Sequence, residues 1–170
     1  PPDPLQGKPT LAAARSAFEA LPPVRILFDN GAGGAQPGQP YPGFEQSFAR
    51  FPLPGTTASS WYLEGGGVLA PAKPVSAGSD TFTWNKGARP ATDFTGDTGS
   101  GGLWNATPAY NWTQNPAGTA LSYVSAPLTT NTVVVGGGAV EAWVRSTARD
   151  VDLQATVTEV RPDGKETFVQ

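Results

Sequence analysis

Histidine, cysteine and methionine are all absent from the 170 residues of this chain. Without histidine the chain cannot assemble a Ser-His-Asp triad or any imidazole general base. Without cysteine it has no thiol nucleophile, no disulfide and none of the usual zinc sites. The localisation, secreted or cytoplasmic, stays unknown because cysteine use can be read either way. The chain begins Pro-Pro-Asp-Pro rather than with methionine, which indicates a piece of a longer polypeptide or a processed form.

Basic charge and long apolar runs are also scarce. Eleven Lys and Arg residues face 14 Asp and Glu residues, which gives a net charge of −3 with no basic cluster. Such a surface is a poor partner for nucleic acid or for an anionic membrane. The apolar runs fall far short of the roughly 20 residues that cross a bilayer. We therefore expect neither nucleic acid nor membrane as a partner.

Catalytic and cofactor motifs are missing too. No serine lies in a G-x-S-x-G elbow. Gly31 and Gly33 follow a predicted strand, but Gln36 stands where a dinucleotide fingerprint needs its third glycine, and prolines replace the helix that would hold a pyrophosphate. Lys8 follows a glycine as in a P-loop, but Pro9 removes a needed N–H group. The sequence predicts no catalytic residue and no cofactor site.

The residues that are present favour strands and turns. The chain has 21 Gly, 18 Pro and 17 Phe, Trp and Tyr residues (8 + 5 + 4), together with many Val and Thr. A helix is predicted only from Thr10 to Leu21, where Thr10 can cap the start and Pro22 stops the end. Leu11, Ala14, Phe18 and Leu21 share one face at helical spacing and predict packing against a neighbour.

Short runs rich in β-formers predict the strands. The expected strands cover residues 24–28, 60–63, 81–84, 121–125, 133–135, 140–146, 153–160 and 167 onward. Residues 140–146 alternate apolar and polar side chains, as a half-buried strand does. Gly164, after Pro162 and Asp163, predicts a hairpin turn because glycine accepts positive φ. We expect a mainly β fold, a sandwich or jelly roll, with one short N-terminal helix. The chain stops just after this hairpin, so we expect the domain to be truncated at its C-terminus.

Paired carboxylates are the first candidates for a site. Asp93 and Asp97 lie in a Gly/Thr-rich loop and are weak candidates for calcium ligands, although no EF-hand order is present. Asp150 and Asp152 are two apart, so in an extended segment they share a face. Turn capping and surface ion pairing explain both pairs better than a glycosidase pair does. We therefore predict no metal site beyond the weak calcium candidates.

Aromatic side chains in the long loop of residues 85–120 are the stronger binding candidates. Trp104, Tyr110 and Trp112 could contact a substrate by stacking on a sugar or an aromatic acyl group, or could cover the domain's own core. Asn105 and Asn111 each begin an N-glycosylation sequon, which matters only in a secreted eukaryotic protein. A free-standing carbohydrate-binding module is therefore an alternative function, and a purely structural domain is a third.

The order of several motifs resembles one protein family. They run from Tyr-x-Ser-x-Pro-Leu through a Gly-rich turn and a strand to an Asp-x-Asp step and a Pro-Asp-Gly hairpin. The matching positions are Tyr123, Ser125, Pro127, Leu128, residues 136–138, residues 140–144, Asp150, Asp152 and residues 162–164. Taken together, this order resembles the C-terminal non-catalytic domain of the X-Pro dipeptidyl-peptidase and cocaine-esterase-like serine hydrolases. Glu159 departs from the aspartate that relatives usually carry before the hairpin.

The resemblance implies a galactose-binding-like jelly roll over residues 24–170, packed beside an α/β-hydrolase catalytic domain of the same polypeptide. Residues 1–23 would be a linker and helix at the tail of that preceding domain. The neighbour would supply the triad that this chain lacks, for hydrolysis of an ester or of an X-Pro peptide. The resemblance therefore implies an accessory domain that shapes the active-site rim, without cofactor or catalytic residues of its own.

Overall fold

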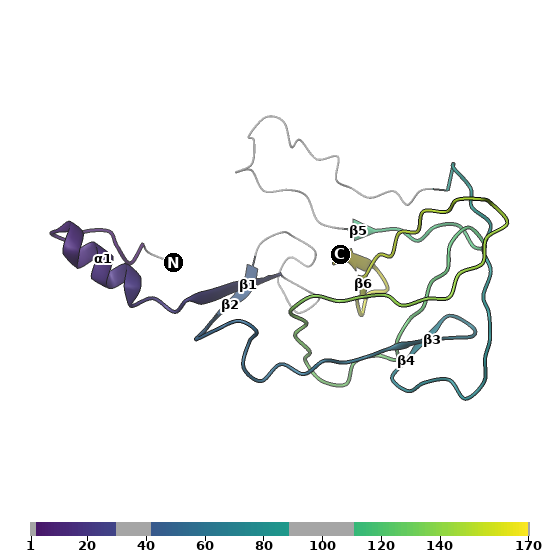
Figure 1. Ribbon diagram of the computed structural model, residues 1–170, viewed down its shortest axis with the longest axis horizontal. Coiled ribbons are helices and arrows are strands. Elements are labelled where there is room, and N and C mark those ends of the chain that lie inside the picture. Colours follow the sequence, from purple (N-terminus) through teal and green to yellow (C-terminus); the bar gives the residue numbers. More distant parts are fainter. Residues whose placement is uncertain (1–2, 30–41, 89–110, 170) are drawn as a thin grey trace.

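The computed structural model describes residues 3–29, 42–88 and 111–169. Within these ranges, short strands form three small antiparallel sheets, and one helix precedes them (Figure 1). The elements are α1 (Leu11–Glu19), β1 (Val24–Asp29), β2 (Pro42–Phe48), β3 (Tyr62–Glu64), β4 (Val68–Ala70), β5 (Asn111–Trp112), β6 (Thr158–Val160) and β7 (Glu166–Phe168). The mainly β class with one short N-terminal helix is confirmed.

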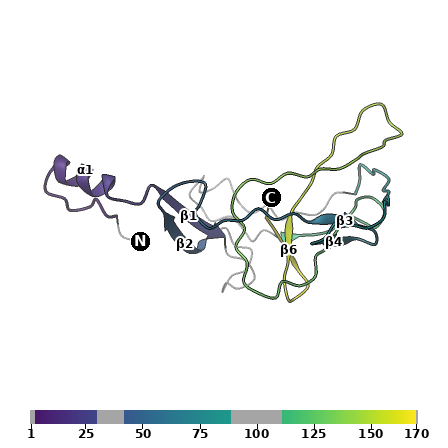
Figure 2. The same ribbon diagram turned by 60° about the horizontal axis from the view of Figure 1, so that its bottom comes forward.

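The helix α1 begins where the sequence predicts it. Thr10 is extended, and its hydroxyl oxygen accepts a hydrogen bond from the Ala13 N–H at 3.1 Å. The apolar side chains of Leu11 and Phe18 nevertheless stay exposed, and no helix residue is buried. Both ribbon views place α1 at one end of the molecule, beyond β1 and β2 (Figures 1 and 2). The described residues do not cover the apolar face of this helix, so its predicted packing against a neighbour stays a prediction.

The sheet of β1 and β2 is held by pairs of side chains across the strands. The rings of Phe28 and Phe44 stack with centroids 4.7 Å apart, opposite each other in the strand register. Arg25 and Glu45 form an ion pair on the exposed strands. The register shifts after Phe28, as it does at a β-bulge. The strand β2 begins at Pro42, where the sequence predicts no strand, and its pairing with β1 outweighs its weak local signal.

The hairpin of β3 and β4 anchors the predicted strand of residues 121–125. Leu69 donates its N–H to the Val124 carbonyl oxygen at 2.9 Å, and Val124 donates to the Gly67 carbonyl oxygen at 2.8 Å. These two bonds form an isolated parallel bridge between Val68 and Val124. Residues 121–125 therefore lie beside β4 but pair with it at a single position.

Several predicted strands are not formed. Residues 81–84, 133–135, 140–146 and 153–157 form no strand, and only the end of the predicted strand 153–160 appears, as β6. A strand needs a partner for its backbone groups as well as a favourable pattern. The alternating residues 140–146 gain no buried face, because every one of them is exposed.

Apolar burial in the described ranges is small. Phe28, Leu53 and Ala70 are the buried apolar residues there, and Arg161 and Thr167 are buried polar ones. Many large apolar side chains elsewhere are exposed, and Val75 and Trp143 are exposed completely. The described residues therefore leave much of the apolar surface that the sequence provides in contact with solvent.

Candidate functional site

The β6–β7 hairpin gives the candidate site its frame. Gly164 has a φ of +78°, which confirms the predicted turn, and its N–H donates to the Arg161 carbonyl oxygen at 2.9 Å. The Asp163 carboxylate accepts the Lys165 N–H at 3.0 Å. That hydrogen bond, aided by the Arg161 guanidinium, lowers the pKa of Asp163. The turn is thus closed both by backbone and by side-chain bonds.

Arg161 stabilises one side of this hairpin. The Arg161 guanidinium is buried and donates from Nη1 to the Thr167 hydroxyl at 2.7 Å, and from Nε to Asp163 at 3.4 Å. Such a buried charge costs free energy unless it is hydrogen-bonded, and here both partners belong to the same hairpin. Arg161 therefore fixes the hairpin rather than facing a ligand.

The other side carries a cluster of polar groups around Glu166. Thr158 donates its hydroxyl to Glu166 Oε2 at 2.8 Å. Gln114 donates from Nε2 to both carboxylate oxygens, at 3.0 and 2.8 Å. Trp112 joins the cluster because it lies opposite Glu166 in the pairing of β5 with β7. An aromatic ring, an amide and a carboxylate are thereby held together by three chain segments.

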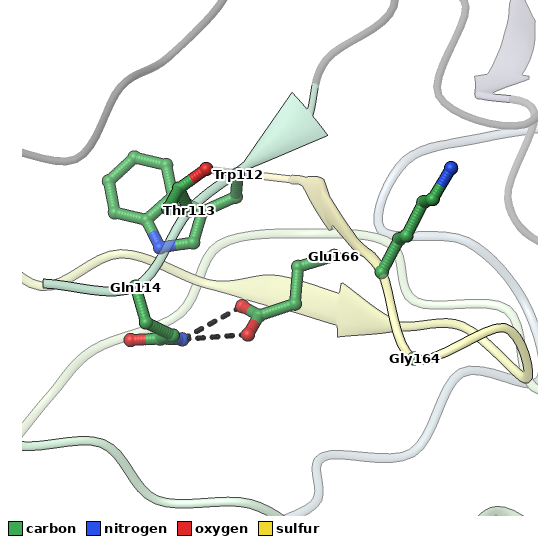
Figure 3. Close-up of a pocket in the computed structure, with 6 residues that line it drawn as sticks. Trp112, Thr113, Gln114, Gly164 and Glu166 are labelled. Atoms are coloured by element: carbon green, nitrogen blue, oxygen red, sulfur yellow. Dashed lines mark hydrogen bonds between the residues drawn. The ribbon is translucent and has the colours of Figure 1, made fainter.

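An open hollow of about 470 Å³ lies over this cluster (Figure 3). Its lining residues come from β5 and the loop after it, and from the turn and start of β7: Trp112, Thr113, Gln114, Gly164, Lys165 and Glu166. Figure 3 shows the Gln114 amide directed at the Glu166 carboxylate beside the Trp112 indole. The arrangement offers hydrogen bonds and an aromatic surface. It offers no nucleophile and general-base pair.

A second polar contact lies away from the hollow. Tyr123 donates its hydroxyl to Asp80 Oδ2 at 2.8 Å. Burial, helped by the Asp80 carboxylate, raises the pKa of Tyr123 from 10.0 to about 12. A phenol held protonated in this way ties residues 80 and 123 together and is no general base near neutral pH.

Of the residues singled out in the sequence, Trp112 is placed at the hollow. Trp104 and Tyr110, and the weak calcium candidates Asp93 and Asp97, lie outside the described residues. Their predicted roles stay predictions.

Asp150 and Asp152 are exposed and make no ion pair or hydrogen bond with another described residue. The ion pairing expected of them is therefore not formed.

Three lining residues of the hollow were not predicted from the sequence: Gln114, Lys165 and Glu166. Nothing in their local sequence links them, because Gln114 and Glu166 are 52 residues apart in the chain and meet only through strand pairing. The proximity of Lys165 and Glu166 to the predicted hairpin turn was the available signal.

The described residues show neither a cluster of metal ligands nor a helix that could span a membrane. Among residues 3–29, 42–88 and 111–169, no three His, Cys, Asp or Glu side chains gather as a metal site would require. In the same ranges, no helix combines the length and apolarity needed to cross a bilayer.

These features define a mainly β domain with binding groups, and its described residues assemble no catalytic machinery. Residues 16–170 match the family described as the X-Pro dipeptidyl-peptidase C-terminal non-catalytic domain, and the chain belongs to this family. The resemblance to the X-Pro dipeptidyl-peptidase domain is thereby confirmed, whereas the resemblance to cocaine-esterase-like hydrolases stays a prediction. The chain is not the catalytic part of such a peptidase. No curated protein and no solved structure matches the chain.

Proposed function

We propose that this chain is an accessory domain that packs on the α/β-hydrolase catalytic domain of its own polypeptide and shapes the rim of the active site. Membership of a family of non-catalytic peptidase domains supports the proposal most strongly. The amino-acid composition agrees with the proposal. Because the chain has no histidine, a Ser-His-Asp triad would have to come from the neighbouring domain. In this proposal the neighbour hydrolyses X-Pro peptides or, as in the cocaine-esterase-like relatives, esters.

The exposed apolar surface supports a docking role. Leu11 is 86% and Phe18 63% exposed, although both lie on the apolar face of α1. A nine-residue helix that buries none of its residues is marginal in water, since most helix stability in proteins comes from packing an apolar face. Large apolar side chains exposed on one helix face are typical of an interaction site. We assign this helix, within residues 1–23, to the contact with the catalytic domain.

Two predicted strands that do not form in the described chain also support packing on a catalytic domain. Residues 133–135 and 140–146 have strand-like sequences but lack strand partners among the described residues. We propose that residues 24–170 form a jelly roll in the assembled protein, in which these segments gain neighbours. The β-forming composition and the alternation of Val140, Ala142 and Val144 support this arrangement.

Thiol labelling tests the docking role, because the chain has no cysteine of its own. Phe18→Cys places a thiol on the apolar face of α1, and Ser16→Cys places one on the opposite face as a matched control. Both should react rapidly with a maleimide in the isolated chain. In the full-length polypeptide, labelling at position 18 should slow severalfold while labelling at position 16 stays fast.

Equal labelling rates at position 18 with and without the catalytic domain would refute docking through α1. The accessory role has a second test, since the isolated chain should not hydrolyse a chromogenic ester or an X-Pro anilide. Turnover that survives repurification would contradict a non-catalytic role.

A further inference from the structure

The hollow over β5 and β7 has the chemistry of a binding site for an uncharged polyhydroxy ligand. We propose that it binds a neutral sugar, with the Trp112 indole as the stacking surface and the side chains of Gln114, Lys165 and Glu166 as hydrogen-bonding groups. This proposal goes beyond the accessory role, since it needs neither the catalytic domain nor its chemistry.

The polar groups are held in position before any ligand arrives. Glu166 accepts hydrogen bonds from Gln114 at 3.0 and 2.8 Å and from Thr158 at 2.8 Å. A carboxylate has about four acceptor positions, and the amide keeps an unused oxygen acceptor, so both can still bond to hydroxyl groups. Because these side chains are already fixed, a ligand loses less free energy in ordering them.

The aromatic surface gives the site its apolar component. Trp112 lines the hollow and is partly exposed, and its pairing opposite Glu166 sets the ring beside the polar cluster. An indole presents a flat apolar face with an electron-rich surface. A sugar ring offers C–H groups on one face and hydroxyl groups at its edge, so it matches a ring flanked by an amide and a carboxylate.

The charge and size of the hollow narrow the ligand class. Its charged lining residues are one lysine and one glutamate, whose charges cancel, so neither a simple anion nor a simple cation is favoured. A volume of about 470 Å³ falls within the usual range for small-molecule sites of roughly 300–1,000 Å³. The hollow is open, so we expect weak binding, with a Kd of about 1 mM.

Titration of the 170-residue chain tests the proposal, with the indole N–H signals of its five tryptophans followed by NMR. The probes are methyl β-glucoside, methyl β-galactoside, N-acetylglucosamine, cellotriose and maltotriose. At least one should shift the Trp112 signal. Trp112→Ala lacks that indole, so its binding is followed on the NMR signals of the sugar, and it should weaken binding about tenfold or more. Gln114→Ala, at an exposed position, should weaken binding severalfold.

Trp143→Ala is the matched control, because Trp143 is fully exposed and lies outside the hollow. It should bind the sugar as the unsubstituted chain does. The proposal is overturned if no probe shifts the Trp112 signal, if Trp112→Ala and Gln114→Ala both bind normally, or if a zwitterionic dipeptide displaces every sugar at lower concentration. None of these results bears on the labelling of position 18, so failure here leaves the accessory role standing.

Discussion

The glycine at the end of the β3–β4 turn allows the sharpest test of the described fold. Gly67 has a φ of +78°, and a Cβ added to it would lie 2.9 Å from the Ser122 carbonyl oxygen. The preceding Gly66 has a nearly identical φ of +81°, but a Cβ there would meet no atom within 4 Å. Alanine at Gly66 therefore tests backbone strain alone, whereas alanine at Gly67 adds a clash with the Ser122 carbonyl oxygen.

The expected losses follow from these two geometries. Alanine in the left-handed region costs about 1 kcal/mol, and this is the whole effect expected for Gly66→Ala. Gly67→Ala carries the same strain and also pushes residues 121–124 away from the hairpin. That shift weakens the bonds from Val124 to Gly67 and from Leu69 to Val124, each worth about 1 kcal/mol. We expect Gly67→Ala to lower the free energy of unfolding by about 2–3 kcal/mol.

Urea unfolding followed by tryptophan fluorescence measures both losses. Hydrogen exchange at the Leu69 and Val124 amides localises them, since these amides should lose protection in Gly67→Ala but not in Gly66→Ala. Equal destabilisation by the two substitutions, with unchanged protection at Leu69 and Val124, would show that residues 121–125 do not lie against this turn.

Three further predictions concern single side chains. Thr10→Ala should lower the stability of α1 by about 1 kcal/mol, seen as lost helical circular dichroism; unchanged dichroism would disprove the cap. Because the pKa of Tyr123 is raised in the folded chain, its protonated hydroxyl stabilises the fold fully below pH 10. This stabilisation disappears as the pH rises toward 12. The stability difference between the unsubstituted chain and Tyr123→Phe should therefore shrink over that window, and a difference that stays constant would contradict the Asp80 contact. Because the pKa of Asp163 is lowered in the folded chain, its carboxylate stabilises the fold above pH 3.8, and this stabilisation is lost as the pH falls through the lowered pKa. Acid unfolding of Asp163→Asn should lack this loss. Identical acid unfolding curves for the unsubstituted chain and the variant would contradict the stabilising role of the carboxylate.

The elements that the sequence predicted best depend on local chemistry. The start of α1 follows from the Thr10 hydroxyl, and its end lies just before Pro22, where a helix cannot continue. The β6–β7 hairpin follows from a glycine that must adopt positive φ. Each of these signals acts within a few residues, so no knowledge of the rest of the chain is needed.

Elements that depend on distant partners were missed or misplaced. The strand β2 contains Pro42 and Gly43, which disfavour strands, yet it pairs along its length with β1 and stacks Phe44 on Phe28. The candidate site was predicted only in part for the same reason. Trp112 was a binding candidate because it is an aromatic residue in a long loop, whereas Glu166 lies beside it only through the pairing of β5 with β7. A one-dimensional pattern does not specify which strands meet.

The unpaired segments and the helix lead to one physical conclusion by independent routes. Residues 140–146 have a two-residue period and α1 has a helical one, and both periods specify a buried face. Neither face is covered within the described residues, since Val140 is 65% and Leu11 86% exposed. A partner that covers them binds the folded chain and not the unfolded one, so it stabilises the fold by mass action. In the proposed assembly the catalytic domain is that partner, so this domain should unfold at a higher temperature in the full-length polypeptide than in the isolated chain. Thermal unfolding of both measures the difference directly. An equal unfolding temperature for this domain in both would show that these faces need no cover from the catalytic domain.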